Sequence, residues 1–162
     1  DDLILKRMKC RHLRNDVIEV CKKAREYRPD MAFGADIIAG FPTETDEMFL
    51  NTLKIVEECD LTFLHVFPYS ERDGTPAARI PDQVPVPKRK ERAARLRSLG
   101  EAQLDKFHAG QVGKTVQAIV EKGNNDRTEN FALIDLEGDF PAGALVRARI
   151  SDFKNGVLLA KT

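Results

Sequence analysis

An apolar run that passes through Gly-Phe-Pro almost directly into a helix start constrains this fold more than any other feature. The run MAFGADIIAG, residues 31–40, is nearly unbroken and predicts a β-strand covered on both faces. Residues 43–46 then supply capping chemistry for a helix. The side chains that this helix is expected to turn inward are Phe49, Leu53 and Val56.

The same pattern occurs a second time. A helix capped by Asn15 and ended by Pro29 precedes the first strand, and LTFLHVFPY, residues 61–69, predicts a second buried strand. The order helix, strand, helix, strand predicts parallel strands joined by right-handed crossovers. Two such units form part of an α/β sheet or barrel, not a whole one.

The remainder divides into a loop, a basic helix and short strands. Residues 70–87 form a long proline-rich loop, and a helix is predicted over residues 88–108 with Ala94, Leu99 and Ala102 toward the core. Beyond Gly113, short alternating segments predict a small β-barrel. The predicted strands are TVQAIVEK, NFALIDL, ALVRARIS and VLLAKT, with a hairpin at Asn155-Gly156. We place the domain boundary near Gln111, giving domains 1–110 and 111–162.

Overall charge does not indicate a partner, because Lys+Arg and Asp+Glu are both 26. Residues 6–14 and 88–97 are locally basic, and each run is either a solvated helix face or a phosphate-facing surface. The three cysteines show no metal-ligand spacing and suit a reducing cytosol. No apolar run reaches membrane-spanning length.

Ligands of parallel α/β sheets bind at the carboxyl ends of the strands. There, Gly40 is expected to let the backbone approach a ligand, and Ile38 offers an apolar surface. The helix opening near Thr45 offers free N–H groups to an anion or carboxylate. The alternative is a tight strand-to-helix turn without a ligand.

Several motifs in fixed order resemble the methylthiotransferases among the radical S-adenosylmethionine (SAM) enzymes. These motifs are GADIIAGFPTETDEMF, LHVFPYSERDGTPAARIPDQVP and KRKERAARLRSLG, preceded by LILKRMKCRH. The branch that methylthiolates threonylcarbamoyladenosine in tRNA is the most similar. The resemblance implies the C-terminal part of a partial (β/α) barrel followed by an OB-like TRAM domain, an RNA-binding module.

By this resemblance, two strand ends and the first basic segment contact the cofactor. Asp36 stands where related motifs often have Gly, so it either faces the site or merely terminates a helix elsewhere. Phe67 suits a core role as well as a contact role. Cys10 replaces the family's usual Arg, which leaves Arg11 as the better candidate there. The implied cofactor-binding residues are Arg11, Asp36, Ile38, Gly40, Phe67, Tyr69 and Ser70.

The resemblance also implies an RNA-binding surface. Arg72 and Thr75 match the family's Arg-x-Gly-Thr-x-Ala loop, although Glu71 and Asp73 stand where relatives often have Pro. In the last domain the implied residues are Arg127 for a phosphate, Thr128 and Asn130 for a sugar or base edge, and Phe131 for a stacked base. Arg147 and Arg149 either extend this patch or are edge charges that discourage aggregation.

The intact enzyme would use SAM and two 4Fe–4S clusters. We expect the cluster ligands upstream of Asp1, because Cys10, Cys21 and Cys59 cannot form a Cys-ligated cluster. The chain alone is therefore expected to contain no metal ligand or catalytic residue and to be inactive. The implied partners are the tRNA anticodon stem-loop and the N-terminal part of the same cytoplasmic enzyme, with no DNA or membrane. The alternatives are a non-catalytic RNA-binding module and the sister branch that methylthiolates a ribosomal-protein aspartate.

Overall fold

The computed structural model of the chain describes residues 1–123 and 126–162 and contains two compact units, Asp1–Gln103 and Leu104–Thr162. The division falls inside the long helix α4 (Val86–Ala109) rather than near Gln111. None of the helices in the described residues is both long enough and apolar enough to cross a bilayer.

The first unit has α/β architecture, as predicted. Its elements are α1 (Asp2–Arg7), α2 (Arg14–Tyr27), β1 (Phe33–Ala39), α3 (Asp46–Glu58), β2 (Leu61–Pro68), the 3-10 helix η1 (Ala77–Arg79) and most of α4. Strands β1 and β2 pair in parallel, which confirms the parallel pairing inferred from the element order. Helix α1 was not predicted.

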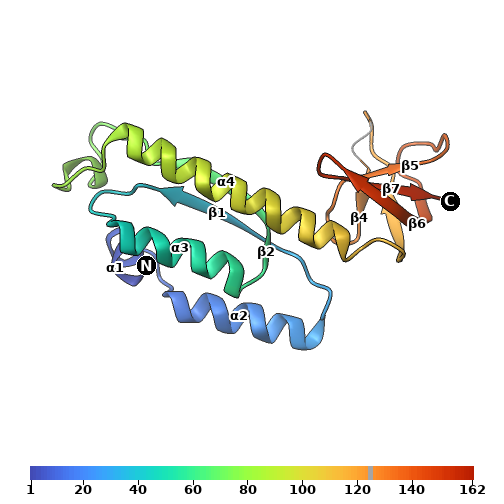
Figure 1. Ribbon diagram of the computed structural model, residues 1–162, viewed down its shortest axis with the longest axis horizontal. Helices are drawn as coiled ribbons and strands as arrows, with labels where there is room; N and C mark the ends of the chain where they lie inside the picture. Colours follow the sequence, from blue (N-terminus) through green and yellow to red (C-terminus); the bar gives the residue numbers. More distant parts are fainter. Residues whose placement is uncertain (124–125) are drawn as a thin grey trace. The chain divides into compact units, whose positions relative to one another are not determined.

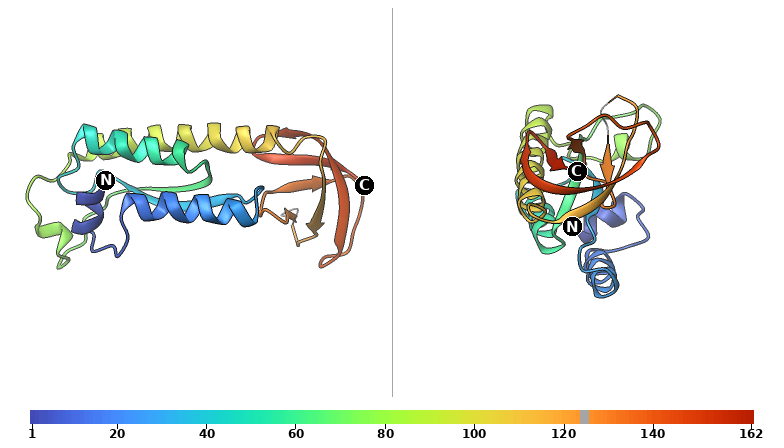
Figure 2. Two further views of the ribbon diagram at one scale, coloured as in Figure 1. Left: turned by 90° about the horizontal axis from the view of Figure 1, so that it is seen from below. Right: turned by 90° about the vertical axis from the view of Figure 1, so that its right-hand side faces the viewer.

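The core of this unit lies between the helices and one face of the two strands. Figure 2 shows α3 and α4 on the same side of β1 and β2, and α2 runs beside α3 in Figure 1. The core comprises Cys21, Ala39, Phe49, Val56, Cys59, Leu61, Ala93 and Leu96. Phe49 and Val56 were predicted to be buried, and Leu53 packs against the core.

Three sequence predictions about this unit are wrong in detail. Strand β1 is covered on one face only, since Gly34, Asp36 and Ile38 alternate as exposed residues. Leu13, not Asn15, is the N-cap of α2, and the Asp16 carboxylate accepts its N–H at 2.7 Å.

The inward face of α4 also differs from the prediction. Ala94 and Ala102 are exposed, whereas Leu99 is partly buried. The buried positions include Ala93 and Leu96 together with the polar residues Arg89, Arg92 and Gln103. Both sequence interpretations of this basic run, a solvated helix face and a phosphate-facing surface, placed Arg89 and Arg92 on the outside, whereas both side chains are buried.

The second unit contains a five-stranded sheet in the order β4-β3-β6-β7-β5. The strands are β3 (Thr115–Ile119), β4 (Arg127–Thr128), β5 (Ile134–Leu136), β6 (Leu145–Lys154) and β7 (Val157–Lys161). All pairings are antiparallel except β5 with β7. The predicted hairpin at Asn155-Gly156 is confirmed, because both residues have positive φ and connect β6 to β7. The strand predicted from Asn130 begins only at Ile134, since Phe131 adopts φ 66° in a turn.

A buried histidine makes the stability of the second unit depend on pH. His108 is fully buried between the rings of Phe107 and Phe153, with centroids 5.8 and 5.6 Å away, and its ring nitrogens have no hydrogen-bond partner among the described residues. Burial lowers the pKa of His108, against a smaller opposing effect of Asp105. The unfolded chain therefore binds the proton more readily, and stability falls as the pH drops below about 6.5, the ordinary value.

Hydrogen exchange of β6 and β7 amides, measured between pH 7.5 and 5, checks this expectation. The opening free energy should decrease toward acid in the native protein, and His108→Phe should flatten that decrease. An equally steep decrease in the variant would assign the pH dependence to other groups.

Candidate functional site

The open face of β1 and β2 brings together several predicted cofactor residues. In the parallel register Ile38 lies opposite Phe67, and Asp36 lies opposite His65. Ile38 is 38% and Phe67 52% exposed, so two adjacent apolar side chains face outward near the carboxyl ends of the strands. His65 was missed by sequence reasoning, although its position two residues before Phe67 places it on the same face.

The Gly40 turn is not an open ligand cradle, contrary to the prediction. Gly40 is buried with φ 74°, and a Cβ there would lie 2.7 Å from Arg89 Cγ and 3.1 Å from Arg89 Cα. Helix α4 therefore occupies the space that sequence reasoning reserved for a ligand. The Gly40 N–H donates to the Glu44 carboxylate at 3.0 Å.

The start of α3 is occupied by the protein's own charged groups. Thr45 is the N-cap, as its hydroxyl accepts the Met48 N–H at 3.2 Å. Arg92, only 3% exposed, donates to the Glu44 carboxylate at 2.7 Å, to the Glu44 carbonyl at 2.9 Å and to Asp46 at 2.8 Å. Two of the protein's own carboxylates, those of Glu44 and Asp46, therefore lie at the start of α3, where both accept from Arg92.

These contacts act on the acidity of both carboxyl groups. Burial raises the pKa of Glu44, while Arg92 and the Gly40 N–H oppose that shift by stabilising the carboxylate. Hydrogen bonds from Arg92 and Lys88 lower the pKa of the exposed Asp46. At neutral pH Asp46 is ionised and forms part of the ion-pair network around Arg92.

The second strand end packs against the first. The Tyr69 N–H donates to the Ala39 carbonyl at 2.8 Å, and the Tyr69 ring meets Phe41 edge-on at 5.4 Å. The Arg89 guanidinium lies 5.0 Å from the Tyr69 ring centroid. Tyr69 therefore contacts the turn and α4, while Ser70 is exposed beyond it. The Tyr69 hydroxyl is buried without a partner among the described residues.

The basic run at residues 88–97 was interpreted as either a solvated helix face or a phosphate-facing surface, and neither interpretation holds for its two buried arginines. Arg89 is 6% exposed and donates to the carbonyls of Val84 and Tyr69 and to the side chains of Glu71 and Gln83. Arg89 and Arg92 thus bind the protein itself rather than solvent or phosphate. In the first run, Arg14 pairs with Glu58 at 2.5 Å, and Arg11 is exposed between α1 and α2.

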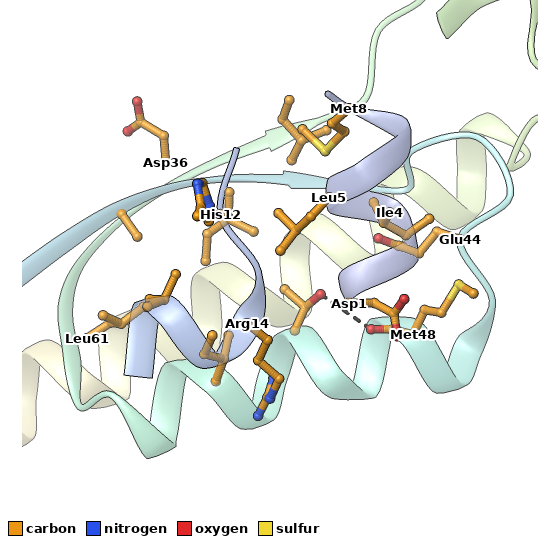
Figure 3. A pocket seen from close by; sticks show the side chains of 16 residues that line it. Asp1, Ile4, Leu5, Met8, His12, Arg14, Asp36, Glu44, Met48 and Leu61 are labelled. Atoms are coloured by element: carbon orange, nitrogen blue, oxygen red, sulfur yellow. Dashed lines mark hydrogen bonds between the residues drawn. The ribbon is translucent and has the colours of Figure 1, made fainter. Parts of the chain in front are cut away.

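A cavity of about 190 Å³ lies beneath α1 and is lined mainly by apolar side chains. Figure 3 shows Leu5, Ile4 and Met48 around it, whereas the Asp36 carboxylate points away from them. Asp36 and Ile38, which lie on the open face of β1, are nevertheless among the residues that line this cavity.

The loop after β2 uses its predicted threonine internally. The Thr75 hydroxyl donates to the Arg72 carbonyl at 2.8 Å and accepts the Ala78 N–H at 3.3 Å. Arg72 is exposed. The loop therefore presents the arginine side chain while the threonine shapes the turn.

Strand register places the predicted arginines of the second unit on one sheet face. Ile119 lies opposite both Arg127 and Leu145, and Arg147 and Arg149 follow Leu145 at alternate positions of β6. Lys161 of β7 lies opposite Arg149 and adds a cation that sequence reasoning missed. We call this surface the basic face; it comprises Ile119, Arg127, Leu145, Arg147, Arg149 and Lys161.

A stacked pair borders the basic face. The Arg127 guanidinium lies 4.3 Å from the Phe131 ring centroid, and Arg127 donates to the Phe131 carbonyl at 3.0 Å. Phe131 is nevertheless 67% exposed. Thr128 is buried, and its hydroxyl accepts the Ala132 N–H at 3.2 Å. Asn130 is partly buried in the same turn.

The residues of the described chain do not fit an iron–sulfur cluster. Cys21 and Cys59 are buried in the core, and Cys10 lies in the segment before α2. Burial raises the pKa of Cys59 to about 11, with the neighbouring Cys21 contributing, so Cys59 stays protonated. Among the described residues no group of three or more His, Cys, Asp or Glu side chains is arranged to hold a metal ion.

Three curated relatives are similar to nearly the whole chain. The threonylcarbamoyladenosine tRNA methylthiotransferase MtaB of Rickettsia prowazekii is 52% identical over 98% of this chain and 37% of the relative. MtaB of Aquifex aeolicus is 35% identical over 91% of this chain and 36% of the relative. The tRNA-2-methylthio-N(6)-dimethylallyladenosine synthase of Bacillus subtilis is 37% identical over 93% of this chain and 31% of the relative. The chain thus spans about a third of the length of these relatives. No protein-family model matches the chain.

Proposed function

Because the chain belongs to the tRNA methylthiotransferase family, we propose that it is the C-terminal part of an enzyme that adds a methylthio group to threonylcarbamoyladenosine next to the tRNA anticodon. The main support for this proposal is that the chain is 52% identical, over 98% of its length, to a relative named for that substrate. The Bacillus subtilis relative, which is named for dimethylallyladenosine, matches at the lower identity of 37%.

The first unit is proposed to be part of a radical SAM barrel, with its open face toward the cofactor. Ile38 and Phe67 fit an adenine ring, because both are apolar, exposed and directly opposite each other. The exposed Asp36 carboxylate suits the hydroxyl or amino groups of the same molecule as a hydrogen-bond acceptor. When bound, SAM and two 4Fe–4S clusters held outside this chain supply the radical, sulfur and methyl chemistry. This chain orients the adenosine and excludes water.

The second unit is proposed to be a TRAM domain that binds the anticodon stem-loop. The basic face combines four cations with exposed apolar side chains, which suits phosphates beside unstacked bases. Arg127, Arg147 and Arg149 would contact phosphates, and Phe131 would stack on a base. Two further residues proposed for RNA binding, Arg72 and Thr75, lie in the first unit. Arg72 would contact the RNA, and Thr75 would act by shaping the loop. We propose that the enzyme is cytoplasmic and that this chain works together with the N-terminal part of the same enzyme. We propose no binding to DNA or to a membrane.

Mass spectrometry of tRNA nucleosides tests the substrate. Deleting the gene should abolish the 2-methylthio form of threonylcarbamoyladenosine and leave the unmethylthiolated nucleoside, and the full-length gene should restore it. The segment encoding this chain alone should not restore it. Loss of a methylthiolated dimethylallyladenosine instead would reassign the substrate. Unchanged tRNA nucleosides would favour the RNA-binding module or, with loss of a ribosomal-protein aspartate modification, the sister branch.

A further inference from the structure

Two buried arginines of α4 hold both strand-end turns at once. Arg89 and Arg92 are three residues apart and therefore lie on the same side of the helix. Arg92 binds the turn after β1 through Glu44 and Asp46. Arg89 binds the segment after β2 through the Tyr69 carbonyl and Glu71.

The contact between Arg92 and Glu44 reaches the open face through the backbone. One carboxylate oxygen, Glu44 Oε1, accepts both from Arg92 and from the Gly40 N–H, at 2.7 and 3.0 Å. Gly40 follows Ala39 at the end of β1, two residues beyond Ile38. The position of Glu44 therefore sets where the strand end turns, and Arg92 sets the position of Glu44.

The chemistry of this pair requires an arginine. The planar guanidinium donates to the Glu44 carbonyl, the Glu44 carboxylate and Asp46 simultaneously, a geometry that a lysine ammonium does not reproduce. Both Arg92 and Glu44 side chains are only 3% exposed, so losing one partner leaves a buried charge that moves toward water or a new partner. Such a movement displaces the Gly40 turn.

We infer that Arg92 and Glu44 are positioning residues that hold the end of β1, and with it Ile38, in the geometry that receives the adenosine of SAM. This inference rests on the proposed function. It assigns the buried part of the basic helix to cofactor binding rather than to RNA contact. Arg89 supports the same arrangement at the end of β2.

The test compares Arg92→Lys and Glu44→Gln with Arg97→Gln in the full-length reconstituted enzyme. Arg97 is an exposed arginine of the same helix and provides the matched control. Hydrogen exchange of the peptide covering Gly40–Thr45, without cofactor, reports the turn directly. For each variant we would also measure the affinity for SAM, the KM for SAM, kcat and the affinity for tRNA.

We expect Arg92→Lys to accelerate exchange in that peptide and to weaken SAM affinity by about tenfold or more, as small displacements at binding sites do. The KM for SAM should rise more than kcat falls, and tRNA affinity should stay within about twofold. Glu44→Gln keeps an acceptor for the Gly40 N–H and should show a smaller change in the same direction. Arg97→Gln should match the native enzyme in every measurement.

Normal exchange and normal SAM affinity in Arg92→Lys would overturn the inference. Lost tRNA affinity with normal SAM affinity would overturn it in favour of RNA binding by α4. A native enzyme that binds no SAM would refute the proposed function and, with it, the cofactor role of Arg92 and Glu44. If Arg92→Lys fails to fold, the exchange and affinity of Glu44→Gln decide the outcome.

Discussion

Gly40→Ala is expected to destabilise the first unit by about 2–5 kcal/mol. The left-handed backbone at φ 74° costs a side chain about 1–2 kcal/mol, and overpacking adds about 1–3 kcal/mol. The overpacking is unavoidable because the new Cβ meets Arg89 Cγ, Cβ and Cα, the near end of a residue fixed in α4. Hydrogen exchange of β1 and α3 peptides in the full-length enzyme measures the loss.

Gly74→Ala is the matched control for this prediction. Gly74 has a similar φ of 79°, but a Cβ there has nothing within 4 Å among the described residues. Its cost should therefore be limited to the backbone contribution of about 1–2 kcal/mol. Equal losses in the two variants would contradict the proposed clash with α4.

Phe131→Ala is expected to weaken tRNA binding by the full-length enzyme by about 1–3 kcal/mol, since an exposed ring that stacks on a base contributes that much. This corresponds to a loss of about 5- to 150-fold in affinity. The ring is 67% exposed and is oriented by Arg127, whose guanidinium lies 4.3 Å from the ring centroid. Affinities measured across a salt series provide the test.

Two further variants separate stacking from charge. Arg147→Ala should reduce the salt dependence by about one phosphate contact, whereas Phe131→Ala should leave that slope nearly unchanged. Tyr27→Ala removes another exposed aromatic ring, 81% accessible on α2, and should not alter binding. Unchanged affinity in both Phe131→Ala and Arg147→Ala, with loss on replacing Lys88 and Lys90, would place RNA on the basic helix.

Local sequence patterns were sufficient to predict most of the architecture. Alternation, capping residues and turn residues predicted the two strands, the helices that flank them and the hairpin at Asn155-Gly156, because these depend on near neighbours. The parallel pairing of β1 with β2 followed from the order of the elements and the crossover rule. The same alternation predicted that Arg147 and Arg149 share a face. Register then placed Arg127 and Lys161 on that face, which requires knowing which strands pair.

The tertiary structure alone decided what the Gly40 turn and the basic helix do. By itself, the sequence determined that Gly40 ends a strand and that residues 88–97 carry many cations. It could not show that α4 crosses this turn, because the contact joins residues about fifty positions apart. That packing fills the space beside Gly40 with Arg89 and buries Arg92 against Glu44. A charge that would be solvated on an isolated helix is thereby bound to a buried carboxylate.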